Sequence, residues 1–227
     1  MILKKSWNLF LREKKDRDKM ETANIDDKIF LLGSILGLTS EKSEIKKIFE
    51  RIKPDAVALS VSDDELEGLK KISDGEKQEI LLSGYEEVYA KKLAAHGEVQ
   101  VPPPSLTEAF ELSKENSVPV YAVDMNDKEY TDAFTKNVST IQLILHSLKI
   151  KKVRKKRFKS KTPETFVFEW DKTVNKLKGF RALEKKREEY ISKRLSELSE
   201  RHNKILAVIE LQRLKGISEI LGRNRNL

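Results

Sequence analysis

Charged side chains stand where several predicted strands of this 227-residue chain end. Asp124 closes the apolar segment VPVYAVD, and Glu210 closes KILAVIE, with Arg213 three residues later. In an open α/β sheet, the carboxyl ends of the parallel strands meet at one edge, which is where ligands usually bind. A carboxylate at this edge can act as a general base or a metal ligand, and an arginine can bind an anion.

These side chains form one crevice if the strand ends converge. Arg187, from a highly charged segment before the last strand, is the fourth candidate. Two acids beside two arginines predict an ion-pair network in place of a metal. The network either stabilises the fold, which we favour, or binds a small anion. Asp124 has a simpler alternative role, as the cap of a helix beginning near Asp127 or as the partner of a nearby base.

The three histidines do not form a recognisable metal site. His96, His146 and His202 fall in separate predicted elements, without the spacing that metal ligands have. The chain also has no cysteine, which excludes disulfides, thiolate nucleophiles and cysteine-ligated zinc. We therefore expect neither a metal site nor a cofactor.

Positive charge is concentrated in residues 149–161, KIKKVRKKRFKSK. The segment holds nine basic residues and no acid, and the whole chain has a net charge of +8, so the remainder is near neutral (+8 − 9 = −1). The predicted basic patch consists of Lys151, Lys152, Arg154, Lys155, Lys156 and Arg157.

Three interpretations of residues 149–161 stay open. Clustered lysine and arginine can neutralise the phosphates of a nucleic acid or the anionic surface of a membrane. Phe158 is the only aromatic residue in the segment, so base stacking has little support. Ile150, Val153 and Phe158 can instead anchor the segment as a solvent-facing outer element of the body, which we favour.

Composition and hydropathy bound the class of protein. Hydrophobic residues make up 38% of the chain and charged residues 36%, a balance typical of a protein with much exposed charged helix. The sequence has no run of about 18 apolar residues, as a membrane span requires. We predict a cytoplasmic protein with one domain over residues 26–227, preceded by an amphipathic basic helix and linker in residues 1–25. That helix can dock on the body, on a partner subunit or on an anionic membrane.

Apolar runs alternate with helical patterns, which indicates an α/β fold with a mainly parallel or mixed central sheet flanked by helices and a long C-terminal helix. Residues 21–28 are expected to form a connecting turn. Strands are predicted over residues 29–32, 55–61, 118–124 and 204–210. Helices are predicted from Ser40 to Pro54, from Asp63 or Asp64 to Ile72, over 83–97, from a Ser105–Glu108 capping box, over 127–148, over 170–201 with a break near Gly179, and after residue 213.

The predicted long helix over residues 170–201 carries an apolar stripe and dense mixed charge. The mixed charges favour pairs four residues apart. Antiparallel pairing of this helix with a second copy across a two-fold axis would cover the stripe. We therefore expect a homodimer, with an anionic partner at residues 149–161 as a further possibility.

Four segments, taken in order, resemble motifs of the TraB/PrgY family, which is related to the Tiki proteins. The family has a strand leading into a Gly-Thr-Ala-His type turn, a second strand followed by an acid, a strand ending in aspartate, and a helix beginning Glu-Arg before a Gly-x-Gly-His turn. The corresponding segments here are LLGSILGLTSEKS, IKPDAVALSV, SVPVYAVDMND, and KKREEYISKRL followed by ILAVIELQRLKGIS. The resemblance covers roughly residues 28–222.

The resemblance implies a metal-dependent hydrolase or protease whose two histidines bind the metal with nearby acids. In this chain Leu36 stands at the first histidine position, and Glu210-Leu211-Gln212-Arg213 replaces the second histidine motif. The acid after the second strand falls at Ser60, with Asp63 and Asp64 close by. The glutamate of the Glu-Arg element becomes Lys186, whereas Arg187 and Asp124 are retained.

These replacements indicate a catalytically degenerate TraB-like protein that acts through binding or assembly rather than as an enzyme. Leucine cannot bind a metal, and arginine stays protonated and repels cations. The candidate pocket is formed by Leu36, Asp124, Arg187, Glu210 and Arg213. Two alternatives remain, namely a metal-dependent hydrolase with a rebuilt site around Asp124 and Glu210, and a nucleic-acid-binding protein that uses residues 149–161.

Overall fold

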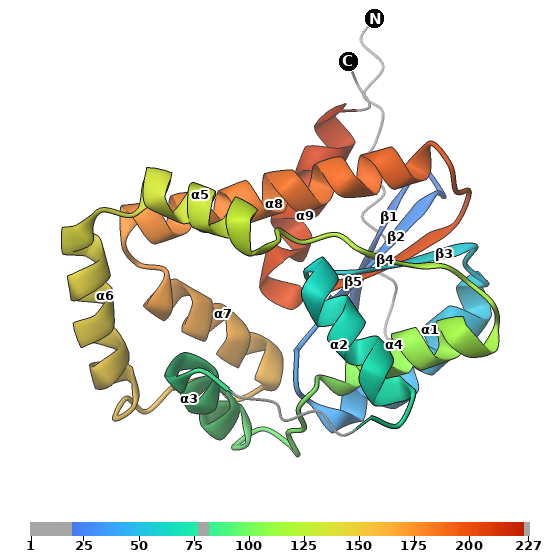
Figure 1. Ribbon diagram of the computed structural model, residues 1–227. Coiled ribbons are helices and arrows are strands. Elements are labelled where there is room, and N and C mark those ends of the chain that lie inside the picture. The colour runs from blue at the N-terminus through green and yellow to red at the C-terminus, as the bar shows by residue number, and fades with distance from the viewer. Residues whose placement is uncertain (1–19, 77–81, 225–227) are drawn as a thin grey trace, which may run out of the picture.

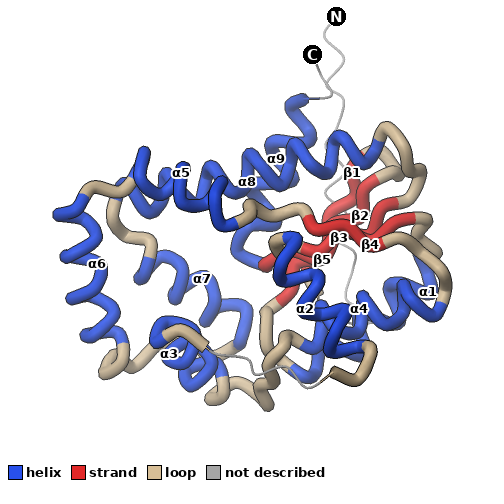
Figure 2. Tube along the Cα trace, in the orientation of Figure 1, coloured by secondary structure: helices blue, strands red, loops and turns tan. Residues whose placement is uncertain are grey.

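A computed structural model describes residues 20–76 and 82–224 of the chain. Apart from Met20, the predicted N-terminal helix lies outside these described residues. The described chain forms a five-stranded sheet flanked by helices, which confirms the predicted α/β fold (Figures 1 and 2). None of its described helices is both long and apolar enough to cross a membrane.

The sheet is parallel except at one edge. Its strands are β1 (Glu21–Ile25), β2 (Ile29–Ser34), β3 (Ala56–Leu59), β4 (Val120–Ala122) and β5 (Ile205–Glu210), in the spatial order β1-β2-β5-β3-β4. Strands β2, β5, β3 and β4 run parallel, whereas β1 pairs antiparallel with β2. The carboxyl ends of four strands therefore lie at the same edge.

The prediction of a connecting turn over residues 21–28 was wrong. Residues 21–25 form strand β1, and only Asp26 and Asp27 make the turn, with φ angles of 52° and 55°. Asn24 Nδ2 donates to Asp27 Oδ1 at 2.7 Å across this turn. The polar segment forms a strand because its backbone completes the hydrogen bonds of β2, a tertiary effect that overrides local propensity.

Two apolar clusters lie on opposite faces of the sheet, because successive strand residues point to opposite sides. Along β5, Ile205, Ala207 and Ile209 join one cluster, whereas Leu206 and Val208 join the other. The second cluster is covered by α1 (Lys42–Ile52), α2 (Asp63–Ser73) and α4 (Pro104–Glu115), and a 3-10 turn, η1 (Thr39–Glu41), precedes α1.

Two predicted helix starts on this face were wrong. Helix α2 is capped by Ser62, whose Oγ accepts the Glu65 N–H, rather than by Asp63 or Asp64. Helix α4 begins at Pro104, so Ser105 already lies inside the helix and forms no capping box with Glu108. Proline suits this first helical position because its missing N–H has no partner there in any case.

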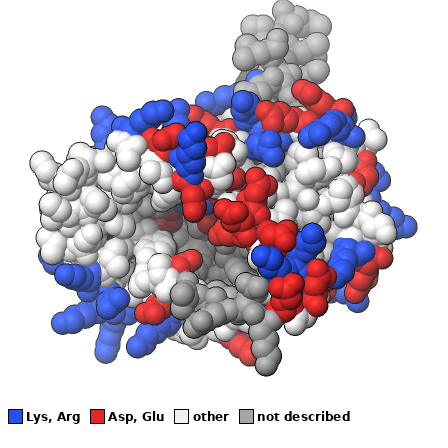
Figure 3. Space-filling view, in the orientation of Figure 1, with Lys and Arg blue, Asp and Glu red and all other residues white. Residues whose placement is uncertain are grey.

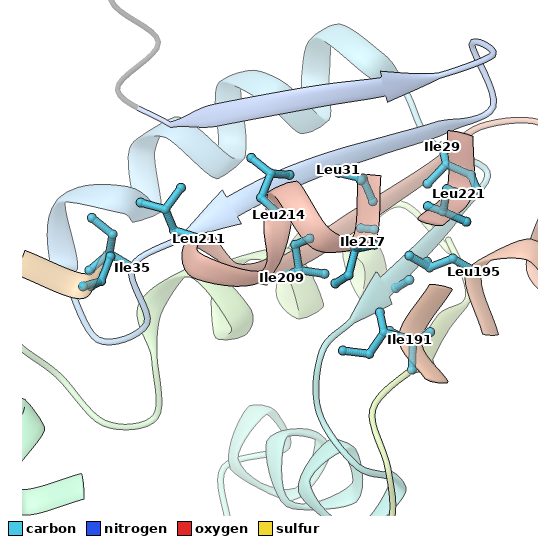
Figure 4. Close-up of a cluster of buried hydrophobic side chains, with 14 of the residues drawn as sticks. Ile29, Leu31, Ile35, Ile191, Leu195, Ile209, Leu211, Leu214, Ile217 and Leu221 are labelled. Atoms are coloured by element: carbon cyan, nitrogen blue, oxygen red, sulfur yellow. The ribbon is translucent and has the colours of Figure 1, made fainter. Parts of the chain in front are cut away.

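The opposite face is covered by α8 (Lys178–Ser199) and α9 (Leu211–Asn224). Figure 4 shows Leu211, Leu214, Ile217 and Leu221 of α9 pointing toward Leu31 and Ile29 of β2 and toward Ile209. The labelled side chains are all at most 6% exposed. Ile191 and Leu195 of α8 reach the same cluster.

The apolar stripe of α8 is therefore covered by the protein's own sheet and by α9. Ile191, Leu195 and Leu198 are fully or almost fully buried, and Tyr190 donates its hydroxyl to Glu129 Oε1 at 3.0 Å. A second copy is therefore not required to cover this stripe, and the expected homodimer stays a prediction.

Four helices extend beyond the carboxyl ends of the strands (Figure 1). They are α3 (Gly84–Leu93), α5 (Asp127–Asn137), α6 (Thr140–Val153) and α7 (Pro163–Val174). The predicted helix over 127–148 is divided in the structure, and the helix over 170–201 is interrupted shortly before Gly179, close to the predicted break. Ser139 accepts the Gln142 N–H and starts α6 anew, and residues 175–177 separate α7 from α8. Helix α3 ends at Leu93, four residues before the predicted stop at Gly97.

Candidate functional site: a charged network at the strand ends

Arg187 lies between three carboxylates that come from three parts of the fold. Its guanidinium forms an ion pair with Asp124, which follows β4, and lies 3.4 Å from Glu210 Oε2 at the end of β5. One turn earlier in α8, Glu184 Oε2 is 3.0 Å from Arg187 Nη1. The predicted meeting of Asp124, Arg187 and Glu210 is therefore present in the structure.

Arg213, in the first turn of α9, extends the same network. Its guanidinium forms an ion pair with Asp171 of α7 and lies 3.2 Å from Glu188 Oε1 and 3.4 Å from Glu184 Oε2 of α8. Glu184 is thus shared by both arginines. We call the whole set the strand-end network, which consists of Asp124, Asp171, Glu184, Arg187, Glu188, Glu210 and Arg213.

Leu36 lies outside the strand-end network. Its side chain packs against the apolar cluster under α1, α2 and α4. The neighbouring Ile35 points to the other face and joins the cluster under α9. The position that the family resemblance assigns to a histidine therefore carries an apolar side chain that belongs to the core.

Acids outnumber arginines in the strand-end network by five to two, and the electrostatics reflect this excess. Burial raises the pKa of Glu188 and of Glu210 to about 7 and also raises that of Glu184. Burial lowers the pKa of Arg213 to about 10, and the three neighbouring acids raise that of Arg187. Both arginines therefore stay protonated at neutral pH, while part of the acid charge is neutralised by protons.

A second buried polar network closes the end of β2. Ser34 Oγ donates to Glu41 Oε2 at 2.6 Å and lies 2.6 Å from Ser105 Oγ. The Ile35 N–H donates to Glu41 Oε1 at 2.8 Å. Burial raises the pKa of Glu41 to about 7. These three side chains form what we call the serine–glutamate network.

Aromatic side chains from α3 and α7 pack against one another beside the two networks. Trp170 Nε1 donates to the Tyr85 hydroxyl at 2.8 Å, and the ring of Tyr89 packs against Trp170 with centroids 5.3 Å apart. Burial raises the pKa of Tyr85 to about 12, so its hydroxyl stays neutral. Figure 3 shows acidic side chains gathered near the middle of the molecule in this view.

The donors at the strand ends do not fit a divalent metal. In the described part of the chain, no three histidine, cysteine, aspartate or glutamate side chains are placed to hold a metal ion together. The acids of the strand-end network face protonated guanidinium groups, which fill the positions between them. A cation entering here would have to displace an arginine and would meet its charge.

The three histidines lie in separate places. His146 stacks on Phe180 with ring centroids 3.9 Å apart, and His202 Nε2 is 3.0 Å from the Tyr121 hydroxyl. His96 lies against Phe166, with ring centroids 5.2 Å apart. Each histidine therefore has a local packing role.

The basic residues 149–161 form the C-terminal end of α6, as far as Val153, and continue into the loop before α7. Val153 is buried, and Ile150 and Phe158 pack against the core, so these side chains anchor the segment as expected. Lys156 is held at Glu169, 3.1 Å away. The other five residues of the predicted basic patch are exposed.

Sequence reasoning missed six residues of these two networks, namely Ser34, Glu41, Ser105, Asp171, Glu184 and Glu188. Glu184 and Glu188 stand four residues apart in a helix rich in both charges, which resembles a solvated surface pattern. Asp171 and the serines lie in elements whose contacts depend on the tertiary fold. One feature of the sequence indicated that some of these residues belong together. It is the spacing of Glu184, Arg187 and Glu188, which puts all three on one side of a helix.

Two apolar surface grooves lie away from the strand ends. One, of about 280 Å³, runs between α2 and α4 beside Phe110, and the other, of about 330 Å³, lies between β1, β2 and α1. Comparison of the sequence with models of protein families and with curated proteins found no match.

Proposed function

We propose that this chain is a TraB-like protein without hydrolytic activity, and that it acts through binding or assembly. One observation carries the proposal, which is the position of Arg213. Its guanidinium lies among Asp171, Glu184 and Glu188, beside the end of the central strand. In the motif that the sequence resembles, this position belongs to a metal-binding histidine.

The electrostatic consequence supports a binding role. A guanidinium has no lone pair to offer a metal, and its pKa of about 10 keeps it positively charged at neutral pH. The acids around it are paired with arginine or neutralised by protons. Leu36, at the other position assigned to a histidine, is committed to the core. Both replacements therefore favour a rigid, non-reactive structure over a reactive metal centre.

Metal binding and hydrolysis are the measurements that test this proposal. Purified protein dialysed against zinc or manganese and analysed by plasma mass spectrometry should hold no stoichiometric metal, and a panel of peptide and ester substrates should not be turned over. The same two measurements are made on Arg213→Gln, and Lys215→Gln, on the exposed side of α9, serves as its matched control. A stoichiometric metal that Asp124→Ala removes would overturn the proposal.

A second candidate function is metal-free hydrolysis by carboxyl groups. The observation in its favour is that Glu188, which pairs with Arg213, and Glu210, which pairs with Arg187, both have a pKa of about 7. Groups that titrate near neutrality suit general acid–base catalysis. Under this alternative, turnover would be found in the substrate panel without metal and would disappear in Glu210→Gln, whereas the proposal above predicts none in either protein.

A further inference from the structure

Helix α6 presents its apolar side to solvent. Ile141, Ile144, Leu145 and Leu148 are 71%, 57%, 49% and 51% exposed. Their spacing of three and four residues places them along one face of the helix. Single exposed aliphatic residues are ordinary, but a continuous exposed row on one helix is a feature of interaction surfaces.

The inward side of α6 is unusually polar for a packed helix. Gln142 Oε1 accepts the N–H of Gly179 at 3.1 Å, and His146 stacks on Phe180. Val153, at the end of the helix, is the fully buried residue. The helix is thus held to the body by polar and aromatic contacts along its length and by Ile150 and Val153 near its C-terminal end, while the aliphatic side chains from Ile141 to Leu148 remain exposed.

The same face becomes basic at the C-terminal end of the helix. Lys151 and Lys152 stand three and four residues after Leu148 and are exposed. We call this row the α6 face, which consists of Ile141, Ile144, Leu145, Leu148, Lys151 and Lys152. Figure 3 shows an uncharged expanse over α6 with lysine and arginine side chains at its lower end.

The stretch of sequence that contains the α6 face carries charge of one sign. The sequence has no acid between Asp132 and Glu164, whereas residues 149–161 alone hold nine basic residues. Among the described residues, no carboxylate forms an ion pair with Lys151, Lys152 or Lys155. These cations are available to an external anion.

We propose that the α6 face docks on an anionic lipid surface. The aliphatic row would enter the boundary between headgroups and acyl chains, and the lysines would lie against lipid phosphates. A nucleic acid fits less well, because the row has no aromatic side chain on which a base can stack. A second copy also fits less well, because α6 offers no carboxylate to meet the lysines of its partner.

Vesicle flotation tests this proposal on the full chain. The protein should float with vesicles of phosphatidylcholine plus phosphatidylglycerol and remain below with phosphatidylcholine alone. Replacing Ile144 and Leu148 by serine should abolish flotation. Lys151→Gln with Lys152→Gln should weaken binding by about tenfold or more, since each basic side chain near the surface contributes about 1 kcal/mol.

The control for the lysine pair is Lys193→Gln with Lys215→Gln, two exposed positions on α8 and α9. This control should float like the unmodified protein. Circular dichroism checks that each variant is folded. We expect all of them to fold, because the substituted side chains are exposed. Equal flotation of all variants would overturn the proposal, as would flotation without preference for the anionic lipid.

Two further outcomes would also overturn it and point to another partner. Salt-sensitive binding to DNA or RNA that needs the lysines but not Ile144 would assign the segment to a nucleic acid. A dimer in light scattering that Ile144→Ser dissociates, without vesicle binding, would assign the face to a second copy.

Insertion can be observed directly with a tryptophan at Leu145. The Leu145→Trp protein should show a blue-shifted emission with anionic vesicles and quenching by lipids brominated along the acyl chain, relative to the unmodified protein. An unquenched emission would contradict insertion of the α6 face, even if the lysines attract the vesicle.

Discussion

Arg187 is the residue on which the strand-end network depends most. Three carboxylates share its guanidinium, and its side chain is only 17% exposed. A buried charge network adds little to stability by its presence. Removing one member lowers stability strongly, because the remaining charges keep their desolvation cost. The functional meaning of the network therefore depends on a residue that is also central to stability.

Replacing Arg187 by methionine should lower the free energy of unfolding by about 3–5 kcal/mol at neutral pH, because Asp124, Glu184 and Glu210 would face one another without a cation. The loss should be smaller near pH 5, because burial raises the pKa of Glu184 and of Glu210 and these two acids take up protons as the pH falls. Urea denaturation at both pH values measures the effect. Lys193→Met, on the exposed side of α8, is the control. An equal loss at both pH values would contradict the electrostatic explanation.

Glu41, in the serine–glutamate network, can be replaced without loss of its hydrogen bonds. In Glu41→Gln, the amide oxygen still accepts the Ile35 N–H, and the amide nitrogen donates to Ser34 Oγ. Because burial raises the pKa of Glu41 from 4.5 to about 7, its contribution to stability falls as the pH rises from 4.5 to about 7 and stays lower above that pH. We expect the variant to gain stability over the unmodified protein at pH 8 and to show little difference at pH 5, as measured by thermal unfolding at each pH.

At the scale of elements, α8 is fixed by one close approach at its N-terminus. A Cβ added to Gly179 would overlap Gln142 Oε1 and the carbonyl oxygen of Asn137, and would lie 3.1 Å from Val138 Cα. Two of these atoms belong to the backbone at the α5–α6 corner, which cannot move aside easily. Gly179 therefore sets the angle at which α8 meets that corner.

Gly179→Ala should lower the free energy of unfolding by about 1–3 kcal/mol, because the overlap forces the backbone of the corner to move. Gly68 is the matched control, since it lies in α2 with nothing within 4 Å of an added Cβ. Gly68→Ala should instead raise stability by about 0.5–1 kcal/mol through helix propensity. Denaturant titrations of the two variants compare the effects, and a stable Gly179→Ala protein would contradict the packing argument.

Elements that depend on local pattern were predictable, and those that depend on tertiary contacts were not. The runs IFLL, AVAL and ILAVIE are continuous and apolar, as strands covered on both faces must be. Strand β1 is polar and exists only because β2 offers it hydrogen bonds. The break between α5 and α6 rests on Ser139, whose capping role competes with a continuous helical pattern.

The residues of the candidate site divide in the same way, into those that the sequence predicts and those that depend on tertiary contacts. Asp124, Glu210 and Arg213 could be predicted, because residues at the ends of parallel strands converge by topology. Glu184 and Glu188 could not, because α8 crosses the strand ends at an angle that no local pattern records. The serine–glutamate network was missed for a similar reason, since Ser34 and Ser105 are 71 residues apart in the sequence.

At the scale of the whole molecule, three buried acids with raised pKa values determine how stability varies with pH. Glu41, Glu188 and Glu210 titrate near pH 7 in the folded protein and near the ordinary 4.5 when unfolded. Between these pH values the folded state holds more protons than the unfolded state. The free energy of unfolding therefore decreases as the pH rises through this window.

We expect the midpoint of thermal unfolding to be higher near pH 5 than near pH 8. Scanning calorimetry in buffers of matched ionic strength measures this difference. Glu188→Gln with Glu41→Gln should flatten the dependence. A midpoint that rises steadily from pH 5 to pH 8 would contradict the assigned protonation of the networks.

The order of the strands has a consequence for synthesis of the chain on the ribosome. Strand β5 lies between β2 and β3 in space but is the last of the five to be translated. Until residue 210 has left the exit tunnel, β2 and β3 have no central strand between them, and their inner edges stay open to other chains. The nascent chain thus carries an unfinished sheet from the synthesis of β2 until that of β5, a period in which chaperones that bind exposed strand edges would have their largest effect.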